Sequence, residues 1–267
     1  MNEKRADSEE NKSKQLLCLK CGQFSEDGTT CIRCLESIQL VDDMMDSEKL
    51  RKGLNIILNN FGSDVAAAFR KDPAANSVME VLSYPGIQAI LLHRIAHFFW
   101  KLKLPYIPRY LNFLSRQTTG VDIHPGANIG KEFFIDHGTG VVVGETSIIG
   151  NNVTMYQGAT LGGTGIIRSG KRHPTIGNDV VIGAGAKVLG PINIGDKVKI
   201  GANSVITKNV PKESTVVGVP GTIIARKGRK IPKIDLAHGE LPNPFLEKIQ
   251  QLERRIAELE KQLSKKK

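Results

Sequence analysis

The chain has 267 residues, of which 40% are hydrophobic and 24% charged, so it is long enough for a sizeable core with appendages. No stretch approaches eighteen apolar residues and the charged start lacks the apolar core of a secretion signal, which excludes a membrane span and predicts a cytoplasmic protein. Much of the net charge of +10 lies in segments without interleaved aromatic residues, which argues against a nucleic-acid partner.

The N-terminal segment, residues 1–44, contains all four cysteines of the chain. Its first fifteen residues are charged and polar, and we expect them to be disordered. Four thiolates in two CxxC pairs are typical of a tetrahedral structural zinc site, since disulfides are rare in the cytoplasm and no βαβ pattern supports a redox motif. We therefore predict a zinc-knuckle-like segment whose metal ligands are Cys18, Cys21, Cys31 and Cys34.

Residues 45–118 have apolar side chains at helical spacing and predict an α-helical domain. One helix is expected around Leu50–Leu58 and a second around Val65–Phe69. The second should end before Pro73, because the residue before a proline is pushed out of the α region. Pro85 opens a longer apolar helix, and a last helix leads into the following domain.

Residues 119–226 carry an aliphatic residue at every sixth position, which is typical of a hexapeptide-repeat solenoid. We predict a left-handed parallel β-helix in which each repeat forms one short strand and one turn, and three repeats close one coil. An antiparallel sheet would instead alternate with period two. The inward aliphatic positions are expected at Ile123, Ile129, Ile135, Val141, Ile149, Met155, Leu161, Ile176, Ile182, Val188, Ile194, Ile200 and Ile206.

Two insertions interrupt this register. Val141 and Ile149 are eight positions apart, which places two extra residues between them, and Leu161 and Ile176 are fifteen positions apart. Residues 162–175 must therefore leave the coil as an extruded loop. A long loop on a rigid scaffold is a common place for binding groups.

Residues 227–267 are expected to form a linker and a C-terminal coiled-coil helix. The apolar residues alternate at spacings of three and four, as in an a/d seam, and Arg255 and Glu260 occupy g and e positions suited to an interchain pair. A single amphipathic helix packed on its own chain is the alternative. The seam consists of Ile249, Leu252, Ile256, Leu259 and Leu263.

Three polar clusters interrupt the repeat where packing needs no polar side chain: Asp122–Pro125, Asp136–Thr146 and Lys171–Pro174. A neutral imidazole is suited to act as general base near pH 7, and a carboxylate that fixes its tautomer makes it more effective. His137 and Asp122 can supply this pair. They belong to different faces of the coil, so their contact requires the coil geometry or a neighbouring subunit.

These motifs resemble the bacterial serine O-acetyltransferase family over residues 64–221. The resemblance implies transfer of an acetyl group from acetyl-CoA to the hydroxyl of L-serine, directly and without a catalytic metal. The product would be O-acetyl-L-serine, formed on the way to cysteine. The motifs that carry the resemblance are Asp122-Ile-His-Pro125, Asp136-His-Gly-Thr-Gly140, Val143-Gly-Glu-Thr146, Leu161-Gly-Gly-Thr-Gly165, Arg172-His-Pro174 and Ile182–Gly190, with Lys71–Ala74 and Tyr84–Ala89 in the helical domain.

The resemblance also implies a role for each site residue. His137 would be the general base and Asp122 would orient it, while Glu145 would tune the site. The groups implied to bind the substrates are Asp72 and Asp136 for the serine ammonium, Arg172 and His173 for its carboxylate, and Gly163, Thr164, Ala184 and Ala202 for coenzyme A.

Partners follow from the same resemblance. It implies a homotrimer with active sites between neighbouring β-helices, or a hexamer that is a dimer of trimers. It also implies L-cysteine as a feedback inhibitor in the serine site. Family members that bind O-acetylserine sulfhydrylase end in isoleucine, whereas this chain ends in Lys267, so we expect no tight complex with that enzyme.

Three alternative functions stay open on the sequence alone. The scaffold could acetylate a sugar or another hydroxyl, although Asp72 and Arg172 suit an amino acid better. A metal-dependent hydratase resembling γ-class carbonic anhydrase would need His124, His137 and His173 as its ligands. The chain could also be a non-catalytic scaffold that binds partners through its cysteine segment and coiled coil.

Overall fold

The computed structural model describes the backbone at 16–17, 24–25, 30–31 and 36–37, and it describes residues 47–165, 170–225, 251–256, 258 and 262. The chain divides into two compact units, Met1–Gly53 and Leu54–Lys267. Within the described residues, no helix has both the length and the apolar character needed to cross a membrane.

The first unit contains two short antiparallel strand pairs. β1 (Leu16–Leu17) pairs with β2 (Phe24–Ser25), and β3 (Thr30–Cys31) pairs with β4 (Glu36–Ser37). Each pair brackets one CxxC sequence along the chain. Apart from the backbone of the third cysteine, the predicted zinc ligands lie outside the described residues.

Four helices precede the β-helix. They are α1 (Ser47–Lys71), α2 (Val78–Ser83), α3 (Pro85–Lys101) and α4 (Ile107–Thr119). The two helices expected between residues 50 and 69 form one continuous helix, because the segment between them contains no proline to interrupt it. α1 ends before Asp72 as predicted, whereas the short α2 was not predicted.

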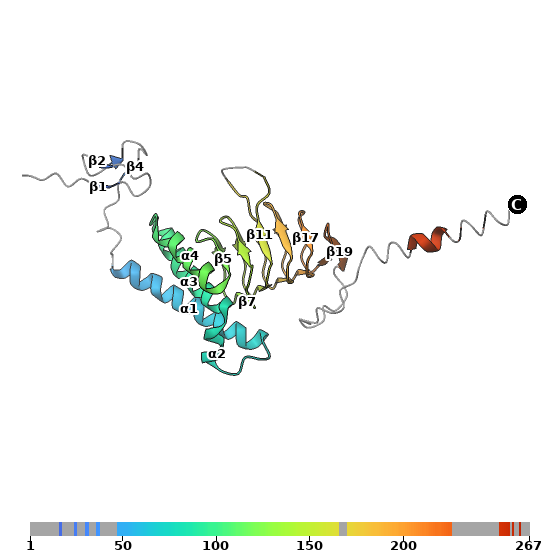
Figure 1. Cartoon of the computed structure of the whole chain (residues 1–267), viewed down its shortest axis with the longest axis horizontal. Coiled ribbons are helices and arrows are strands. Elements are labelled where there is room, and N and C mark those ends of the chain that lie inside the picture. Colours follow the sequence, from blue (N-terminus) through green and yellow to red (C-terminus); the bar gives the residue numbers. More distant parts are fainter. Residues whose placement is uncertain are drawn as a thin grey trace, which may run out of the picture. The chain divides into compact units, whose positions relative to one another are not determined.

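Residues 122–217 form a parallel β-helix with three faces, shown in Figure 1. Its strands are β5 (Asp122–Ile123), β6 (Asn128–Ile129), β7 (Phe134–Asp136), β8 (Val142–Val143), β9 (Ile148–Ile149), β10 (Thr154–Tyr156), β11 (Thr160–Gly162), β12 (Thr175–Ile176), β13 (Val181–Ile182), β14 (Lys187–Leu189), β15 (Asn193–Ile194), β16 (Lys199–Ile200), β17 (Val205–Ile206) and β18 (Thr215–Val217), with β19 (Thr222–Ala225) antiparallel to β18.

The strands repeat in groups of three. One face stacks β5, β8, β11, β14 and β17, a second stacks β6, β9, β12 and β15, and the third stacks β7, β10, β13, β16 and β18. Because successive strands move from face to face, the chain makes about five turns. This architecture matches the predicted left-handed β-helix.

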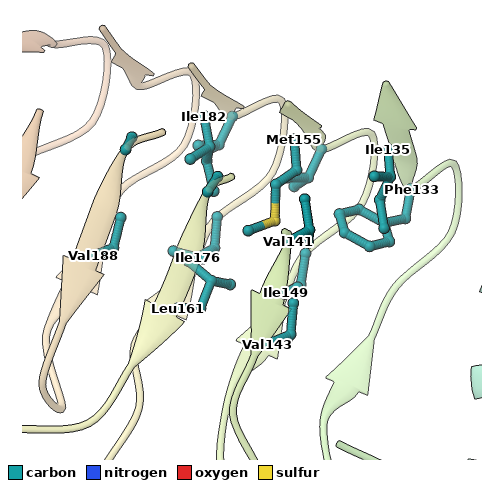
Figure 2. Packing of buried hydrophobic residues seen from close by; sticks show 14 of the residues in the cluster. Phe133, Ile135, Val141, Val143, Ile149, Met155, Leu161, Ile176, Ile182 and Val188 are labelled. Atoms are coloured by element: carbon teal, nitrogen blue, oxygen red, sulfur yellow. The ribbon is translucent and has the colours of Figure 1, made fainter. Parts of the chain in front are cut away.

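The inner aliphatic column corrects the predicted register at one point. Val143, not Val141, aligns with Ile123 and Leu161 in the neighbouring coils. The two extra residues therefore lie between Ile135 and Val143, in the turn after β7, rather than after Val141. Both valines are buried, as Figure 2 shows, so apolar spacing alone could not distinguish them.

A buried ion pair joins the helices to the first coil. Arg94 of α3 donates through Nε and Nη2 to the carboxylate of Asp64 of α1, at 2.6 and 2.9 Å. The same guanidinium donates to the Gly130 carbonyl at 2.8 Å, and the carboxylate accepts the Phe133 amide at 3.0 Å. One polar network therefore holds α1, α3 and the corner between β6 and β7 together.

The start of α3 packs directly on β7. A Cβ on Gly86 would overlap the carbonyl oxygen and side chain of Ile135, so no other residue fits here without movement of the helix. This contact brings the N-terminus of α3 beside the turn that follows β7.

We expect replacement of Asp64 by Ala to lower the free energy of unfolding by about 3–5 kcal/mol, because Arg94 would stay buried without its counter-charge. Denaturant unfolding followed by circular dichroism measures this. The exposed pair Arg70 and Glu132, with Nη2 and Oε2 2.9 Å apart, provides the control, and Arg70→Ala should cost less than about 1 kcal/mol. Equal losses in the two variants would contradict the structural role of the buried pair.

Candidate active site

The two-residue insertion after β7 forms the turn that carries the predicted base. His137 has a φ of 57°, which is uncommon for a residue with a side chain. Its side chain is 74% exposed, and its Nε2 lies 4.0 Å from Oδ1 of Asp136. The insertion therefore presents an imidazole at the surface of the coil, next to a carboxylate.

Asp122, the predicted partner of the base, is held by α4. Its Oδ1 accepts a hydrogen bond from Asn112 Nδ2 at 2.9 Å, and its Oδ2 lies 3.7 Å from Arg116 Nη1. Asn112 also donates to the Ile123 carbonyl at 3.0 Å, which ties the helix to β5. As described for the single chain, Asp122 and His137 make no hydrogen bond or ion pair with each other.

Two further carboxylates, Asp72 and Asp136, lie near a pair of tyrosines. Oδ1 of Asp72 accepts the Ala74 amide at 2.8 Å. Hydrogen bonding to Asp72, with burial and the charges of acidic neighbours that include Asp136, raises the pKa of Tyr84 to about 12. Burial and the charge of Asp136 also raise the pKa of Tyr156 to about 12. Asp72 and Asp136 therefore both raise the pKa of Tyr84, at the N-terminus of α3, although they come from distant parts of the sequence.

The second insertion, between β11 and β12, brings its C-terminal end back over the corner before β9. Arg172 Nη2 donates to Glu145 Oε2 at 2.8 Å. The ring of His173 lies against Gly144, where an added Cβ would overlap it. Thr146 Oγ1 accepts the backbone amides of Arg172 and His173 at 2.9 and 3.0 Å. Within this loop the described residues are 163–165 and 170–174.

Two histidines near this corner have depressed basicity. Burial, followed by the charge of Arg172, lowers the pKa of His173. Burial, followed by the charge of Arg109, lowers the pKa of His124 to about 4. His124 Nδ1 accepts the Gly126 amide at 3.0 Å. The neutral form of both imidazoles is therefore favoured near pH 7.

The described residues contain no group of three or more His, Cys, Asp or Glu side chains that could hold a metal ion. In the single chain, His124, His137 and His173 are thus not assembled into the set that a hydratase would need. The observed partner of His124 is a backbone amide, and that of His173 is Thr146.

The predicted coenzyme A positions fall in two places. Ala184 and Ala202 occupy the same corner of consecutive coils, where the Ala184 carbonyl accepts the Asn203 amide at 2.7 Å. Gly163 and Thr164 begin the long loop, and Gly163 lies beside Arg172 and His173. Gly163 therefore lies near the Arg172–His173 pair, whereas Ala184 and Ala202 lie at the corner that follows β13 and β16.

Several site residues were missed by the sequence analysis. Tyr84 and Thr146 stand inside quoted motifs, but no role was assigned to them. Asn112, Arg116 and Tyr156 lie outside every motif. Their roles depend on contacts between coils and helices, which spacing along the chain does not reveal.

A family model described as bacterial transferase hexapeptide (six repeats) matches residues 173–208. The serine acetyltransferase of Synechococcus elongatus is 51% identical over 208 residues, which are 78% of this chain and 84% of that protein. The serine acetyltransferase of Bacillus subtilis is 52% identical over 205 residues, which are 76% and 94% of the two chains. The chain belongs to the serine acetyltransferase family.

Solved structures of serine acetyltransferases agree with this membership. The Neisseria gonorrhoeae serine acetyltransferase in complex with serine is 40% identical, with a TM-score of 0.62 over 66% of this chain and 73% of that chain. A complex with cysteine is 42% identical, with a TM-score of 0.63 over 67% and 75%. A complex with CoA is 40% identical, with a TM-score of 0.61 over 66% and 74%.

We expect Gly144→Ala to lower kcat/KM for serine by roughly 100-fold, because the new methyl group would displace the His173 ring and small displacements in an active site are costly. Steady-state kinetics of the folded variant measures this effect. Gly62→Ala on α1, where a Cβ meets nothing within 4 Å, controls for a general effect of replacing glycine. Unchanged kcat/KM in Gly144→Ala would show that the ring position is unimportant.

Proposed function

We propose that this chain is a serine O-acetyltransferase that converts L-serine and acetyl-CoA to O-acetyl-L-serine and CoA. The observation that carries the proposal is identity above 50% to serine acetyltransferases over three quarters of the chain. The geometry supports it, because an exposed imidazole lies beside Asp136 on the turn after β7, and an Arg–His pair lies at the corner before β9. An amino acid zwitterion requires groups of both charge signs.

In the proposed mechanism, His137 accepts the proton of the serine hydroxyl while the oxygen attacks the thioester carbonyl of acetyl-CoA. The tetrahedral intermediate then loses the CoA thiolate, and His137 returns the proton to that sulfur. The transfer is direct, so no acyl-enzyme forms, and the proposed steps need no metal ion. The exposure of His137 on the inserted turn leaves its ring accessible to both substrates.

We infer that Asp122 orients the base of a neighbouring subunit. The two side chains make no bond in the single chain, and Asp122 is already fixed by Asn112 from α4. A homotrimer of β-helices, alone or paired as a hexamer, would place one chain's carboxylate near another chain's imidazole. The site is then incomplete in one subunit.

Serine recognition follows from the charges of the remaining site residues. In the proposal, Asp72 and Asp136 bind the ammonium group, and Arg172 with His173 binds the carboxylate. Of the guanidinium nitrogens of Arg172, Nη2 alone has a hydrogen-bond partner among the described residues, and this partner is Glu145. The other guanidinium N–H groups, which have no partner among the described residues, would form a fork with the substrate carboxylate.

Coenzyme A is proposed to lie along the corners at Gly163, Thr164, Ala184 and Ala202, where small side chains let its pantetheine arm approach the backbone. L-Cysteine differs from serine by one atom, so we propose that it occupies the serine site and inhibits competitively. The related structures with cysteine and with CoA support both proposals.

We expect His137→Ala to lower turnover roughly 10²–10⁴-fold, the usual contribution of a general base, with coenzyme A binding retained. Asp122→Asn should cost less, because the imidazole remains and loses only its orientation. Release of free CoA thiol measures turnover, and calorimetry measures coenzyme A binding. Near-normal turnover in His137→Ala would rule out the mechanism.

Mixing the two variants tests the shared site. If the residues come from different chains, hybrid oligomers of His137→Ala and Asp122→Asn subunits contain some sites with both native groups and regain activity. Hybrids that are no more active than the average of the two variants would place both residues in one chain's site.

We also propose one structural zinc ion bound by Cys18, Cys21, Cys31 and Cys34. The antiparallel strand pairs β1–β2 and β3–β4 bracket the two CxxC sequences, and two such hairpins can bring four thiolates together. Four cysteine ligands fill a tetrahedron, which leaves no open position for catalysis.

We expect about one zinc ion per chain in the purified protein, from the four-thiolate stoichiometry of such sites. Deletion of residues 1–44 should remove the metal and leave transferase turnover unchanged, as measured by elemental analysis and the thiol assay. Metal retained after the deletion would instead place the ligands among the histidines.

A further inference from the structure

Thr146 makes hydrogen bonds to three consecutive residues of the long loop. Its Oγ1 accepts the amides of Arg172 and His173 at 2.9 and 3.0 Å. Its own amide donates to His173 Nδ1 at 3.1 Å, and its carbonyl accepts Lys171 Nζ at 2.5 Å. One half-buried side chain and its backbone therefore hold the end of the loop on the coil.

These bonds determine which nitrogen of His173 carries the proton. A backbone amide can only donate, so Nδ1 must accept from Thr146 and the neutral ring carries its hydrogen on Nε2. The Thr146 hydroxyl, which lies 2.9 Å from Nδ1, reinforces the same arrangement. Nε2 is then a donor, and it lies 3.6 Å from the position of a Cβ on Gly163 at the start of the loop.

The charges around the ring favour this neutral donor. Arg172 and Lys171 oppose protonation, Glu145 favours it, and His124 also lies within electrostatic range. Burial contributes most and lowers the pKa of His173. Glu145 meanwhile holds the Arg172 guanidinium, so Glu145 and Thr146 together support two neighbouring hydrogen-bond donors.

We propose that Thr146 is the positioning residue that presents Nε2–H of His173, together with the guanidinium of Arg172, to the carboxylate of the acceptor substrate. The proposal rests on the proposed function for the identity of this ligand. The hydrogen bonds of Thr146 and the tautomer of His173 do not depend on the proposed function.

The full-length protein with Thr146→Val tests this role, because valine keeps the shape and the backbone amide but removes the hydroxyl. We expect KM for serine to rise roughly tenfold through the loss of the two bonds to the loop amides, with KM for acetyl-CoA unchanged. Thr146→Ser should restore KM for serine. Thr175→Val is the matched control. Thr175 lies two residues after His173, and its hydroxyl has no hydrogen-bond partner among the described residues.

Nitrogen-15 NMR of the ligand-free protein provides the readout that a simple stabilising role would not change. The signal of His173, assigned with His173→Gln, should show one Nε2–H tautomer in the native protein and in Thr146→Ser. In Thr146→Val the backbone amide remains, but the hydroxyl contact with Nδ1 and the acceptor of the two loop amides are lost. The ring is then held less firmly against the Thr146 amide, and we expect a mixture of tautomers.

Two results would overturn the proposal: an unchanged KM for serine in Thr146→Val, or a raised KM with the tautomer unaltered. Arg172→Lys separates this failure from failure of the proposed function. If Arg172→Lys leaves KM for serine unchanged, the carboxylate assignment is wrong, whereas the NMR result still decides what Thr146 does to His173.

Discussion

The parallel stacking of short strands, each with one aliphatic side chain inside, is the constraint on which the rest of this structure depends. Ile123, Val143, Leu161, Val188 and Ile206 align on one face through consecutive coils. A closed column of this kind cannot accept an extra residue within a strand, so insertions occur only at the corners. Both insertions of this chain lie at corners of the first three coils, and both carry candidate site residues.

The helices extend the site that the coils begin. Asn112 of α4 holds Asp122, and the start of α3 lies on β7 beside Asp136. The buried network of Asp64 and Arg94 holds α1 and α3 against the same coil, so the position of Asp72 at the end of α1 depends on it. The candidate site therefore contains residues from both the helices and the β-helix.

The β-helix could be predicted from the sequence because its six-residue period is local and repeated many times. The position of the first insertion could not, because Val141 and Val143 are both apolar and both buried. The polar clusters were recognisable as departures from the repeat. The role of Thr146 was not, because its partners are about 26 residues further along the chain and meet it only when the loop returns to the coil.

The central claim is that the acidic and basic groups of the proposed serine site, Asp72, Asp136, Arg172 and His173, select an amino acid acceptor. The most direct test measures release of free CoA thiol from acetyl-CoA with a series of acceptors. L-Serine should support rapid release. Serinamide, which lacks the carboxylate proposed to meet Arg172 and His173, should support little, and sugars should support none above background hydrolysis. Equal rates with serinamide, or faster release with a sugar, would contradict the account.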